Sequence, residues 1–233
     1  MTAAVAIPVY KETPTPAERL SFNQCLRVLG KHPIVLVAPE GLALDTYEPE
    51  TNKLEVVRFA PGYFRSAQTY NKLVLSPDFY VSFAEHDYVL IYQLDAWVFS
   101  DQLASWCEKG YHYIGAPWID RAWVSMFKSG DNNNIVGNGG FSLRHTGMHH
   151  FICERYRTQA EAWRANEDGF WAFEAPKHMP AFKLPSTEEA LRFSFEGAPE
   201  KLFELNDRVL PFGCHGWEGH MTFWSKYIPS GAA

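Results

Sequence analysis

The sequence predicts one α/β domain in which buried strands alternate with helices. Three mostly apolar runs have the length of buried strands: Ala3 to Val9, Pro33 to Val37 and Tyr88 to Tyr92. Between the first two, Ala17 to Leu29 carries an approximate apolar stripe after the helix-start signal Pro14-Thr-Pro16. The 233 residues, 46% of them hydrophobic, are enough for a single core of this kind.

Turn and cap signals extend this alternation along the rest of the chain. Ser66 begins a predicted helix that ends at Ser76, and Asp101 begins one that ends at Lys109. A largely helical stretch runs from residue 145 to 165, whereas residues 119 to 135 are typical of a loop. Further strands are predicted at Leu54 to Phe59, Tyr111 to Ile114, Phe141 to Leu143 and Leu191 to Glu196.

Charge and cysteine content exclude several classes of protein. The formal net charge of −6 argues against a general nucleic-acid binder, whose surface is basic. The 4 cysteines show no Cys-x-x-Cys spacing, so they indicate reduced thiols and not a zinc site or a disulfide framework. The first residues lack the basic and apolar regions of a signal peptide, and no apolar run approaches the ~18 residues of a membrane span. We therefore expect a cytoplasmic protein without a transmembrane segment.

An aspartate interrupts the apolar run that follows the Tyr88 to Tyr92 strand. Asp95 stands between Gln93 and large aromatic residues. A carboxylate in such a run is costly unless it is paired, hydrogen-bonded or bound to a metal. In α/β folds, ligands bind at the carboxyl ends of buried strands. The sequence therefore predicts a ligand site around Asp95.

Two other segments carry residues suited to a nucleotide. Tyr10 and Lys11 follow the first predicted strand, where Tyr10 could stack on a base and Lys11 could contact a phosphate. An ordinary strand exit would give the same pattern. Lys72, in the helix that begins at Ser66, could reach a phosphate or remain a solvated surface lysine.

Adjacent glycines precede the predicted strand at Phe141. Gly139 and Gly140 indicate either a positive φ or a close approach of another chain segment to the backbone. Their spacing fits neither a dinucleotide fingerprint nor a P-loop. His145 and His149 are four residues apart, but no glutamate accompanies them in zinc-protease spacing, so we interpret them as a surface or hydrogen-bonded pair.

Five motifs occur in order along the chain: QLDAWVF from residue 93, GAPW from 115, GNGGFSLR from 137, NEDGFW from 166 and LPFGCHGW from 210. Together with IPVYK from residue 7 and FNQCLRVLGKHPI from residue 22, they resemble a bacterial glycosyltransferase-like family, DUF5672. The resemblance implies a GT-A fold over residues 1–233, a Rossmann-like αβα sandwich with a mixed, mostly parallel central sheet. It also implies a nucleotide-binding half at about residues 1–100 and an acceptor-binding half at about 101–233.

The resemblance assigns roles to individual residues. Gln93-Leu-Asp95 looks like a Gln-x-Asp variant of the Asp-x-Asp motif of GT-A enzymes. Asp95 then takes the metal-binding place, and Gln93 the place that often faces the donor ribose. His215 matches a late histidine that completes the metal shell in some members. Asp168, or its neighbour Glu167, matches the acid that acts as base in inverting members, although both also suit an N-terminal helix cap.

The chemistry of sugar transfer makes matching demands. A divalent cation, Mn²⁺ or Mg²⁺, can neutralise a diphosphate leaving group, and an acceptor hydroxyl needs a general base. Trp118 and Trp217, like Phe170 and Trp171, could stack on the acceptor sugar or belong to the core. Gly139 and Gly140 are further predicted contacts to the substrate. We therefore expect a metal-dependent, inverting glycosyltransferase that moves a sugar from a nucleotide-sugar donor to a glycan acceptor, in the synthesis of bacterial surface polysaccharide or another glycan.

Gln93 in place of a second acid motivates an alternative, a non-catalytic nucleotide- or sugar-binding protein with the same fold. A metal-dependent hydrolase built on Asp95, Asp168 and His215 is a third hypothesis. A nucleophilic Cys214 is disfavoured, because His215 beside it in sequence cannot easily share a catalytic hydrogen bond.

Overall fold

The computed structural model describes residues 1–47, 54–119 and 136–229. A six-stranded sheet forms its centre, with the strand order β3-β2-β1-β4-β7-β6. Its strands are β1 (Ala3–Pro8), β2 (Ile34–Pro39), β3 (Glu55–Phe59), β4 (Tyr88–Tyr92), β6 (Tyr113–Ile114) and β7 (Phe141–His145). Only β7 runs against its neighbours, so the sheet is mixed and mostly parallel. The sheet confirms the α/β class predicted from the sequence.

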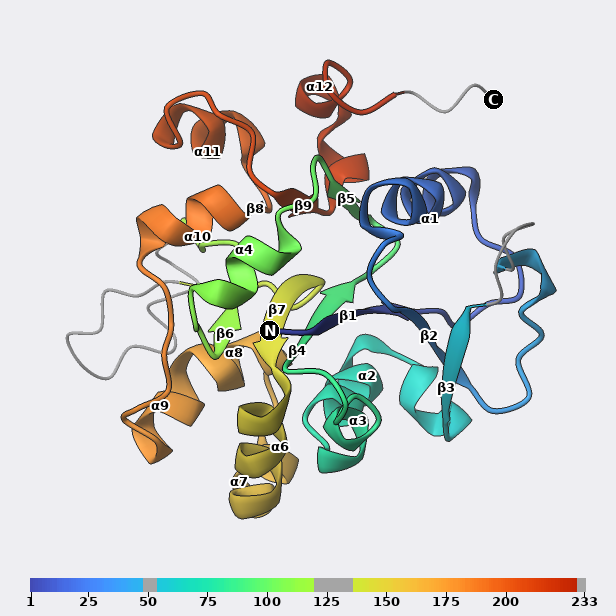
Figure 1. Ribbon diagram of the computed structural model, residues 1–233, viewed down its shortest axis with the longest axis vertical. Helices are drawn as coiled ribbons and strands as arrows, with labels where there is room; N and C mark the ends of the chain where they lie inside the picture. Colours follow the sequence, from blue (N-terminus) through green and yellow to red (C-terminus); the bar gives the residue numbers. More distant parts are fainter. Residues whose placement is uncertain (48–53, 120–135, 230–233) are drawn as a thin grey trace.

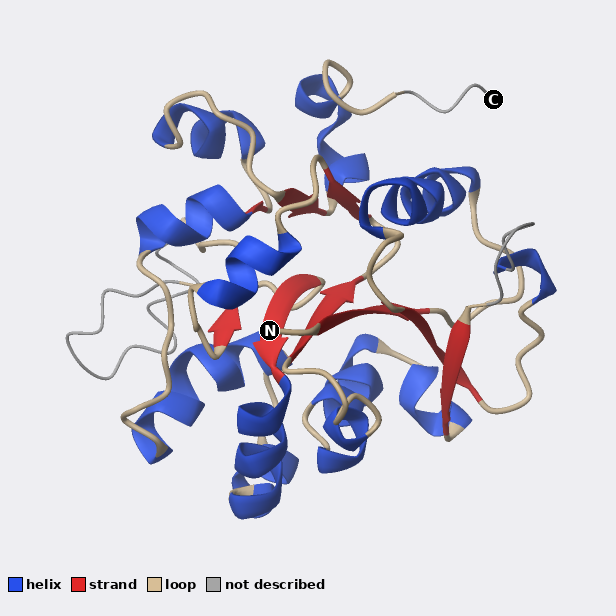
Figure 2. Cartoon of the chain, in the orientation of Figure 1, coloured by secondary structure: helices blue, strands red, loops and turns tan. Residues whose placement is uncertain are grey.

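Helices cover both faces of this sheet (Figures 1 and 2). One hydrophobic core packs the side chains on one face of the sheet against α1 (Pro16–Leu29) and α4 (Leu103–Glu108). A second core packs the opposite side chains against α2 (Ala67–Val74), α3 (Pro77–Val81) and α6 (Thr146–Arg155). In β1, for example, Val5 and Ile7 belong to the first core, whereas Ala4 and Ala6 belong to the second. This alternation follows from the two-residue period of a strand and produces an αβα sandwich.

A smaller sheet lies beside the first and matters for the site. It contains β5 (Ala96–Val98), β8 (Ser194–Phe195) and β9 (Gly213–His215), in the order β5-β9-β8. The other α-helices in the described part of the chain are α7 (Arg157–Ala162), α8 (Glu167–Gly169), α9 (Ala175–His178), α10 (Thr187–Phe193), α11 (Pro199–Leu205) and α12 (Met221–Trp224). Among the described residues, no helix is long and apolar enough to cross a membrane.

Cap chemistry explains why the predicted helices begin where they do. Thr15 and Glu18 form a reciprocal capping box at the start of α1, and Ser66 accepts a hydrogen bond from the Thr69 N–H at the start of α2. Asp101 accepts a bond from the backbone N–H of Leu103, which begins α4. The starts of α1 and α2 are confirmed, whereas α4 begins at Leu103, after Gln102 and not directly after Asp101.

The strand predicted from Leu191 to Glu196 forms only in part. Residues 187 to 193 form α10, and only Ser194 and Phe195 pair as β8. Ser186 accepts a hydrogen bond from the Glu189 N–H, and acids in the first turn favour the helix further. The cap therefore outweighs the apolar-polar alternation that suggested a strand.

Two other predictions are refined. The strand expected from Tyr111 begins at Tyr113, and the helical stretch from residue 145 divides into α6 and α7 at Tyr156. Trp118, in the GAPW turn, is half-buried. Of the loop predicted at 119 to 135, all but Ile119 lies outside the described residues.

Candidate functional site

The carboxyl ends of β1 and β4 lie side by side. The two strands are parallel and pair Ala6 with Ile91, so the residues after each strand emerge at the same edge of the sheet. Tyr10 and Lys11 follow β1, and Gln93 follows β4. Strand register, and not contact between the side chains, therefore brings these distant segments together.

His215 reaches Asp95 because β9 pairs with β5. The register sets Ala96 opposite His215, and the Asp95 carbonyl accepts hydrogen bonds from the backbone N–H groups of Gly216 (2.9 Å) and Trp217 (3.4 Å). The His215 Nε2 atom lies 3.0 Å from Asp95 Oδ1. The backbone on both sides of the ion pair is thus fixed by the sheet.

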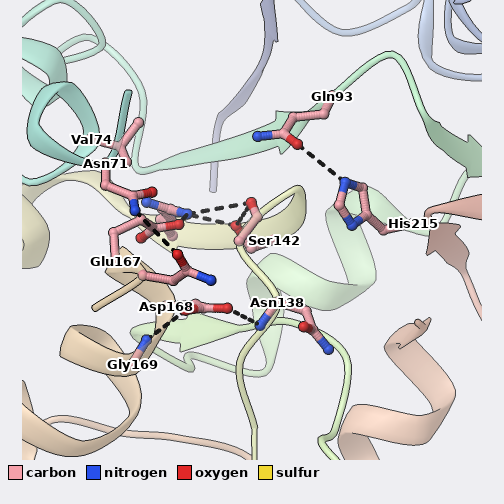
Figure 3. A network of polar contacts seen from close by, with 12 residues as sticks. Asn71, Val74, Gln93, Asn138, Ser142, Glu167, Asp168, Gly169 and His215 are labelled. Carbon is pink, nitrogen blue, oxygen red and sulfur yellow. Dashed lines mark hydrogen bonds and ion pairs between the residues drawn. The ribbon is translucent and has the colours of Figure 1, made fainter. Parts of the chain in front are cut away.

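Three acceptor groups surround the His215 ring. Nε2 lies 3.0 Å from Asp95 Oδ1 and 3.1 Å from Gln93 Oε1, and Nδ1 lies 3.1 Å from Glu196 Oε2 (Figure 3 shows the Gln93 contact). Burial alone would lower the pKa of His215, but its contacts with Asp95 and Glu196 raise that pKa to about 10. Burial would likewise raise the pKa of Asp95, but the hydrogen bond and charge of His215 lower it below its usual value.

Gly140 leaves the space that the His215 ring occupies. A Cβ atom at this position would lie 2.0 Å from His215 Nε2. The Gly140 carbonyl also accepts a hydrogen bond from the Gln93 N–H, at 2.9 Å, because β7 pairs antiparallel with β4. At Gly139, a Cβ atom would lie 1.9 Å from Glu167 Oε1. The close approach predicted for both glycines is therefore confirmed, while the positive φ in this turn belongs to Asn138 (61°).

Asp168 lies in a buried turn opposite these glycines. It is 7% exposed, and its two oxygens accept hydrogen bonds from the backbone N–H groups of Gly169 (2.8 Å) and Asn138 (3.0 Å) (Figure 3). Burial and the charge of the neighbouring Glu167 raise the pKa of Asp168 to about 7. A carboxyl group with such a pKa changes its protonation state near neutral pH, as a general base must.

Glu167 has a different environment from its neighbour. Its Oε1 atom lies 2.7 Å from an Nη atom of Arg144, and both side chains are buried. Arg144 also donates to the Tyr80 hydroxyl (3.1 Å) and to the Ser142 hydroxyl (3.1 Å). Arg144 thus joins β7, α3 and α8. Because its charge is already engaged, Glu167 is less suited than Asp168 to act as a base.

Replacing Arg144 by methionine is expected to lower the free energy of unfolding by about 3 to 5 kcal/mol, because Glu167 would keep a buried charge without a partner. Urea unfolding followed by circular dichroism measures the change. The double variant Arg144→Met/Glu167→Gln should recover part of the loss, since no buried charge remains. A loss below about 1 kcal/mol in the single variant would contradict this account of the pair.

Two adjoining cavities open at this edge of the sheet. The Asp95 cavity, of about 500 Å³, is lined by Tyr10, Lys11, Glu18, Arg65, Gln93 and Asp95, among other residues. The Asp168 cavity, of about 700 Å³, is lined by Trp118, Asn138, Glu167, Asp168, Glu196 and His215, among others. Gln93, Ala67 and Tyr70 line both cavities, so ligands in the two cavities would meet at these residues.

The structure brings most of the predicted site residues to these cavities, but not all. Gly139 and Gly140 line the Asp168 cavity together with Trp118. Lys72 is exposed on α2 and lines neither cavity. Trp217 is 4% exposed and packs edge-on against Trp97, with 6.0 Å between ring centroids, so it belongs to a core.

Two residues of the site escaped the sequence analysis. Arg65 precedes the cap of α2 and lines the Asp95 cavity. Glu196 follows β8 and reaches His215. A basic residue directly before a helix cap was the available signal for Arg65. Glu196 carried no comparable signal, because its place depends on the β8–β9 pairing.

His145 and His149 belong to the architecture of α6. His145 Nδ1 accepts a hydrogen bond from the Met148 N–H at the start of the helix, and His149 Nδ1 lies 3.0 Å from the His145 carbonyl. His149 is fully buried and packs on Trp171, with 4.1 Å between ring centroids. The hydrogen-bonded interpretation of this pair is confirmed, but His149 does not lie on the surface.

The fold is that of GT-A glycosyltransferases. It is similar to mouse xyloside xylosyltransferase 1 in its apo form, with a TM-score of 0.54 and 12% identity over 93% of this chain and 98% of that one. It is also similar to an active-site mutant of LgtC (TM-score 0.51, 13% identity, 91% of this chain and 86% of that one). Core-mannan synthase A from Aspergillus fumigatus, in its Mn/GDP form, gives a TM-score of 0.50 with 10% identity, over 82% and 72% of the two chains.

At these identities the likeness concerns the fold. No curated protein sequence matches the chain. The chain belongs to DUF5672, a family described as a protein of unknown function, which matches residues 53–215. The matched region contains Gln93, Asp95, Asp168 and His215, the residues around which the two cavities are built.

Proposed function

We propose that this protein is a metal-dependent glycosyltransferase that moves a sugar from a nucleoside-diphosphate donor to a hydroxyl group of a glycan acceptor. The observation that carries the proposal is the pair of adjoining cavities, one with Asp95 and the other with Asp168, that share Gln93. A donor in the Asp95 cavity and an acceptor in the Asp168 cavity would bring their reacting groups together at Gln93. Holding two reactants in a reactive geometry can remove about 7 to 11 kcal/mol of the barrier.

The Asp95 cavity suits the nucleoside diphosphate. Tyr10 is 59% exposed and offers its ring for stacking on a base. Lys11 lies 2.8 Å from Glu18, so its charge is partly compensated, whereas Arg65 makes no ion pair among the described residues. We therefore assign the principal cationic contact to the diphosphate to Arg65, with Lys11 in support.

Asp95 and His215 fit a divalent cation. Their Oδ1 and Nε2 atoms are 3.0 Å apart, close enough to serve as neighbouring ligands of one ion, and Mn²⁺ accepts both carboxylate and imidazole. The described residues hold no group of three or more His, Cys, Asp and Glu arranged as a complete metal site. The diphosphate and water would therefore supply the other ligands. When bound, the cation would neutralise negative charge on the diphosphate leaving group.

Asp168 would act as the general base for the acceptor. Its carboxylate lines the Asp168 cavity and can take the proton of an acceptor hydroxyl as that oxygen attacks the anomeric carbon and the diphosphate leaves. A single displacement of this kind inverts the anomeric centre. Glu167, paired with Arg144, would hold the turn that presents Asp168.

A panel of nucleotide sugars in thermal-shift assays, with and without Mn²⁺, tests the donor site. A ligand at 100 times its Kd stabilises the folded state by about 2.7 kcal/mol. For a chain of this size the melting temperature should then rise by roughly 5 to 10 °C. Consumption of the best donor with glycan acceptors tests transfer, and the anomeric configuration of the product tests the role of Asp168. If a donor binds but is not consumed with any acceptor tested, the alternative is favoured: a non-catalytic binding protein, which is suggested by Gln93 in place of a second acid.

Gly140→Ala is expected to weaken metal-dependent donor binding by about 10- to 100-fold, the range seen when the orientation of a metal ligand is disturbed. The added Cβ would displace the His215 ring, whose Nε2 atom is 2.0 Å from the Cβ position. Titration of the donor against Mn²⁺-loaded protein gives the measurement. Gly219→Ala is the matched control, because its Cβ would meet nothing within 4 Å. Equal affinities in the two variants would contradict the role of His215.

A further inference from the structure

The two cavities differ in the charges that line them. Lys11 and Arg65 line the Asp95 cavity, next to the carboxylates of Glu18 and Asp95. The described lining of the Asp168 cavity contains three carboxyl groups, Glu167, Asp168 and Glu196, and no lysine or arginine. The cavity assigned to the diphosphate thus offers cations, and the adjoining cavity offers acids.

The acids of the Asp168 cavity are only partly neutralised. Arg144 compensates Glu167, at 2.7 Å. In the metal-free protein, a protonated His215 lies between Glu196 and Asp95 and can compensate one of the two. Asp168 makes no ion pair among the described residues, and only backbone N–H groups contact its oxygens. Above about pH 7, where Asp168 is ionised, the cavity therefore keeps negative charge in a partly buried space, where a second negative charge is repelled more strongly than in water.

One buried atom also points to the kind of ligand. Glu167 is 4% exposed, and its Oε2 atom has no hydrogen-bond partner among the described residues. A carboxylate oxygen can only accept, so the missing partner is a donor. Glu167 lines the Asp168 cavity, so a small movement of its side chain would bring this oxygen to a hydroxyl donor of a ligand there.

The neutral groups of the same cavity suit a sugar. The side-chain amides of Asn71, Asn138 and Asn166 line it. Trp118 adds a flat aromatic surface, and its indole N–H donates to the Asn138 side chain at 2.9 Å. Amides that can donate and accept, beside an aromatic ring, match the alternating hydroxyl and C–H surfaces of a pyranose.

We propose that the acceptor is an uncharged, hydroxyl-rich sugar, and that the Asp168 cavity rejects sugars that carry a carboxylate or a phosphate. This inference rests on the proposed function, in that it assigns the Asp168 cavity to the acceptor. Two effects would produce this selectivity. The cavity forms hydrogen bonds with the hydroxyl groups of a neutral sugar, and its carboxylates repel a sugar that carries its own negative charge, because like charges repel strongly at short range in a partly buried site.

Matched pairs of sugars test the proposal. The neutral probes are methyl β-D-glucopyranoside and methyl β-D-galactopyranoside, and the charged probes are the corresponding glucuronide and galacturonide, which differ only in a carboxylate at C6. Ligand-observed NMR titrations of the full chain, with and without uridine or guanosine diphosphate and Mg²⁺, give each Kd. We expect the uronide of a binding pair to bind at least about tenfold more weakly than its neutral partner at low salt, with a smaller ratio at high salt.

Two variants with the same change in net charge locate the effect. Glu196→Gln removes a charge that lines the cavity, and the ratio of the two Kd values should fall about threefold or more. Glu200→Gln removes an exposed charge four residues further along, on α11, and should leave the ratio unchanged. The Glu200 variant therefore controls for the net charge of the molecule.

Equal or tighter binding of the uronides, or no binding of either neutral probe, would overturn the proposal. Its failure and the failure of the proposed function give different results. Discrimination against uronides without any donor turnover would confirm the selectivity of the Asp168 cavity and overturn the glycosyltransferase proposal. Turnover that prefers an anionic acceptor would do the reverse.

Discussion

Asp168→Asn is expected to lower kcat by about 100- to 10,000-fold, the contribution of a well-placed general base. Asparagine keeps the size of the side chain but cannot take a proton from the acceptor. The backbone N–H groups of Asn138 and Gly169 hold the carboxylate in place, and the neighbouring Glu167 is engaged by Arg144 at 2.7 Å. Nucleotide-sugar consumption under saturating substrates measures the effect, and circular dichroism checks the fold.

The role of Asp168 as a base also predicts how kcat/KM depends on pH. A base acts when deprotonated, and the pKa of Asp168 is raised to about 7. The kcat/KM of the wild type should therefore fall about tenfold per pH unit below pH 7 and level off above it. The residual activity of Asp168→Asn should lack that slope. Asp207→Asn is the control, because Asp207 is exposed and lines neither cavity. A variant at 168 with the wild-type rate and profile would remove Asp168 from the reaction.

Asp95→Asn is expected to remove the stimulation by Mn²⁺ and to lower turnover by about 100-fold or more, since charge neutralisation by a cation contributes several kcal/mol to transfer from a diphosphate. The neutral amide would be a poorer ligand for a hard cation than the carboxylate. The decisive measurement is the rise in melting temperature with donor and Mn²⁺ together. We expect this rise to disappear in Asp95→Asn.

Asp168→Asn provides the contrast, because its donor site is intact and it should keep the full thermal shift. Asp95→Glu retains the charge and should recover part of the Mn²⁺ effect. An unchanged Mn²⁺-dependent shift in Asp95→Asn would show that the cation, if one binds, lies elsewhere. The two aspartates are thus distinguished by different assays: one by donor binding, the other by turnover and pH.

The sequence predicted the parts of the fold that local patterns control. Buried apolar runs gave β1, β2 and β4, and the caps at Thr15 and Ser66 gave α1 and α2. The direction of β7 was beyond such patterns, because an antiparallel strand in a parallel sheet is set by its neighbours. The partial strand at Leu191 to Glu196 has a similar origin, since Ser186, outside the alternating segment, decided the outcome.

The sequence predicted which residues belong to the site better than it predicted the interactions between them. Asp95 was identifiable because a carboxylate after an apolar strand requires a partner or a ligand. In the structure Asp95 lines a cavity. Its neighbour His215, 120 positions away in the chain, came from the family resemblance, and their 3.0 Å contact depends on the β5–β9 pairing. The buried Arg144–Glu167 pair and the pKa of Asp168 depend on tertiary packing, which no local motif encodes.

The hydrogen bonds that the Asp95 carbonyl accepts from Gly216 and Trp217 have a consequence for ligand binding. They join main chain to main chain, so the two candidate ligand residues are held together whatever side chains they carry. The entropy of assembling this half of the metal shell is lost during folding and need not be lost again when a donor arrives. Exchange of the side chains at positions 93, 95 or 215 should then alter which cation is preferred while the surrounding backbone stays in place. Rearrangement on donor binding is accordingly expected in side chains such as Tyr10 and Arg65, at the open side of the cavity.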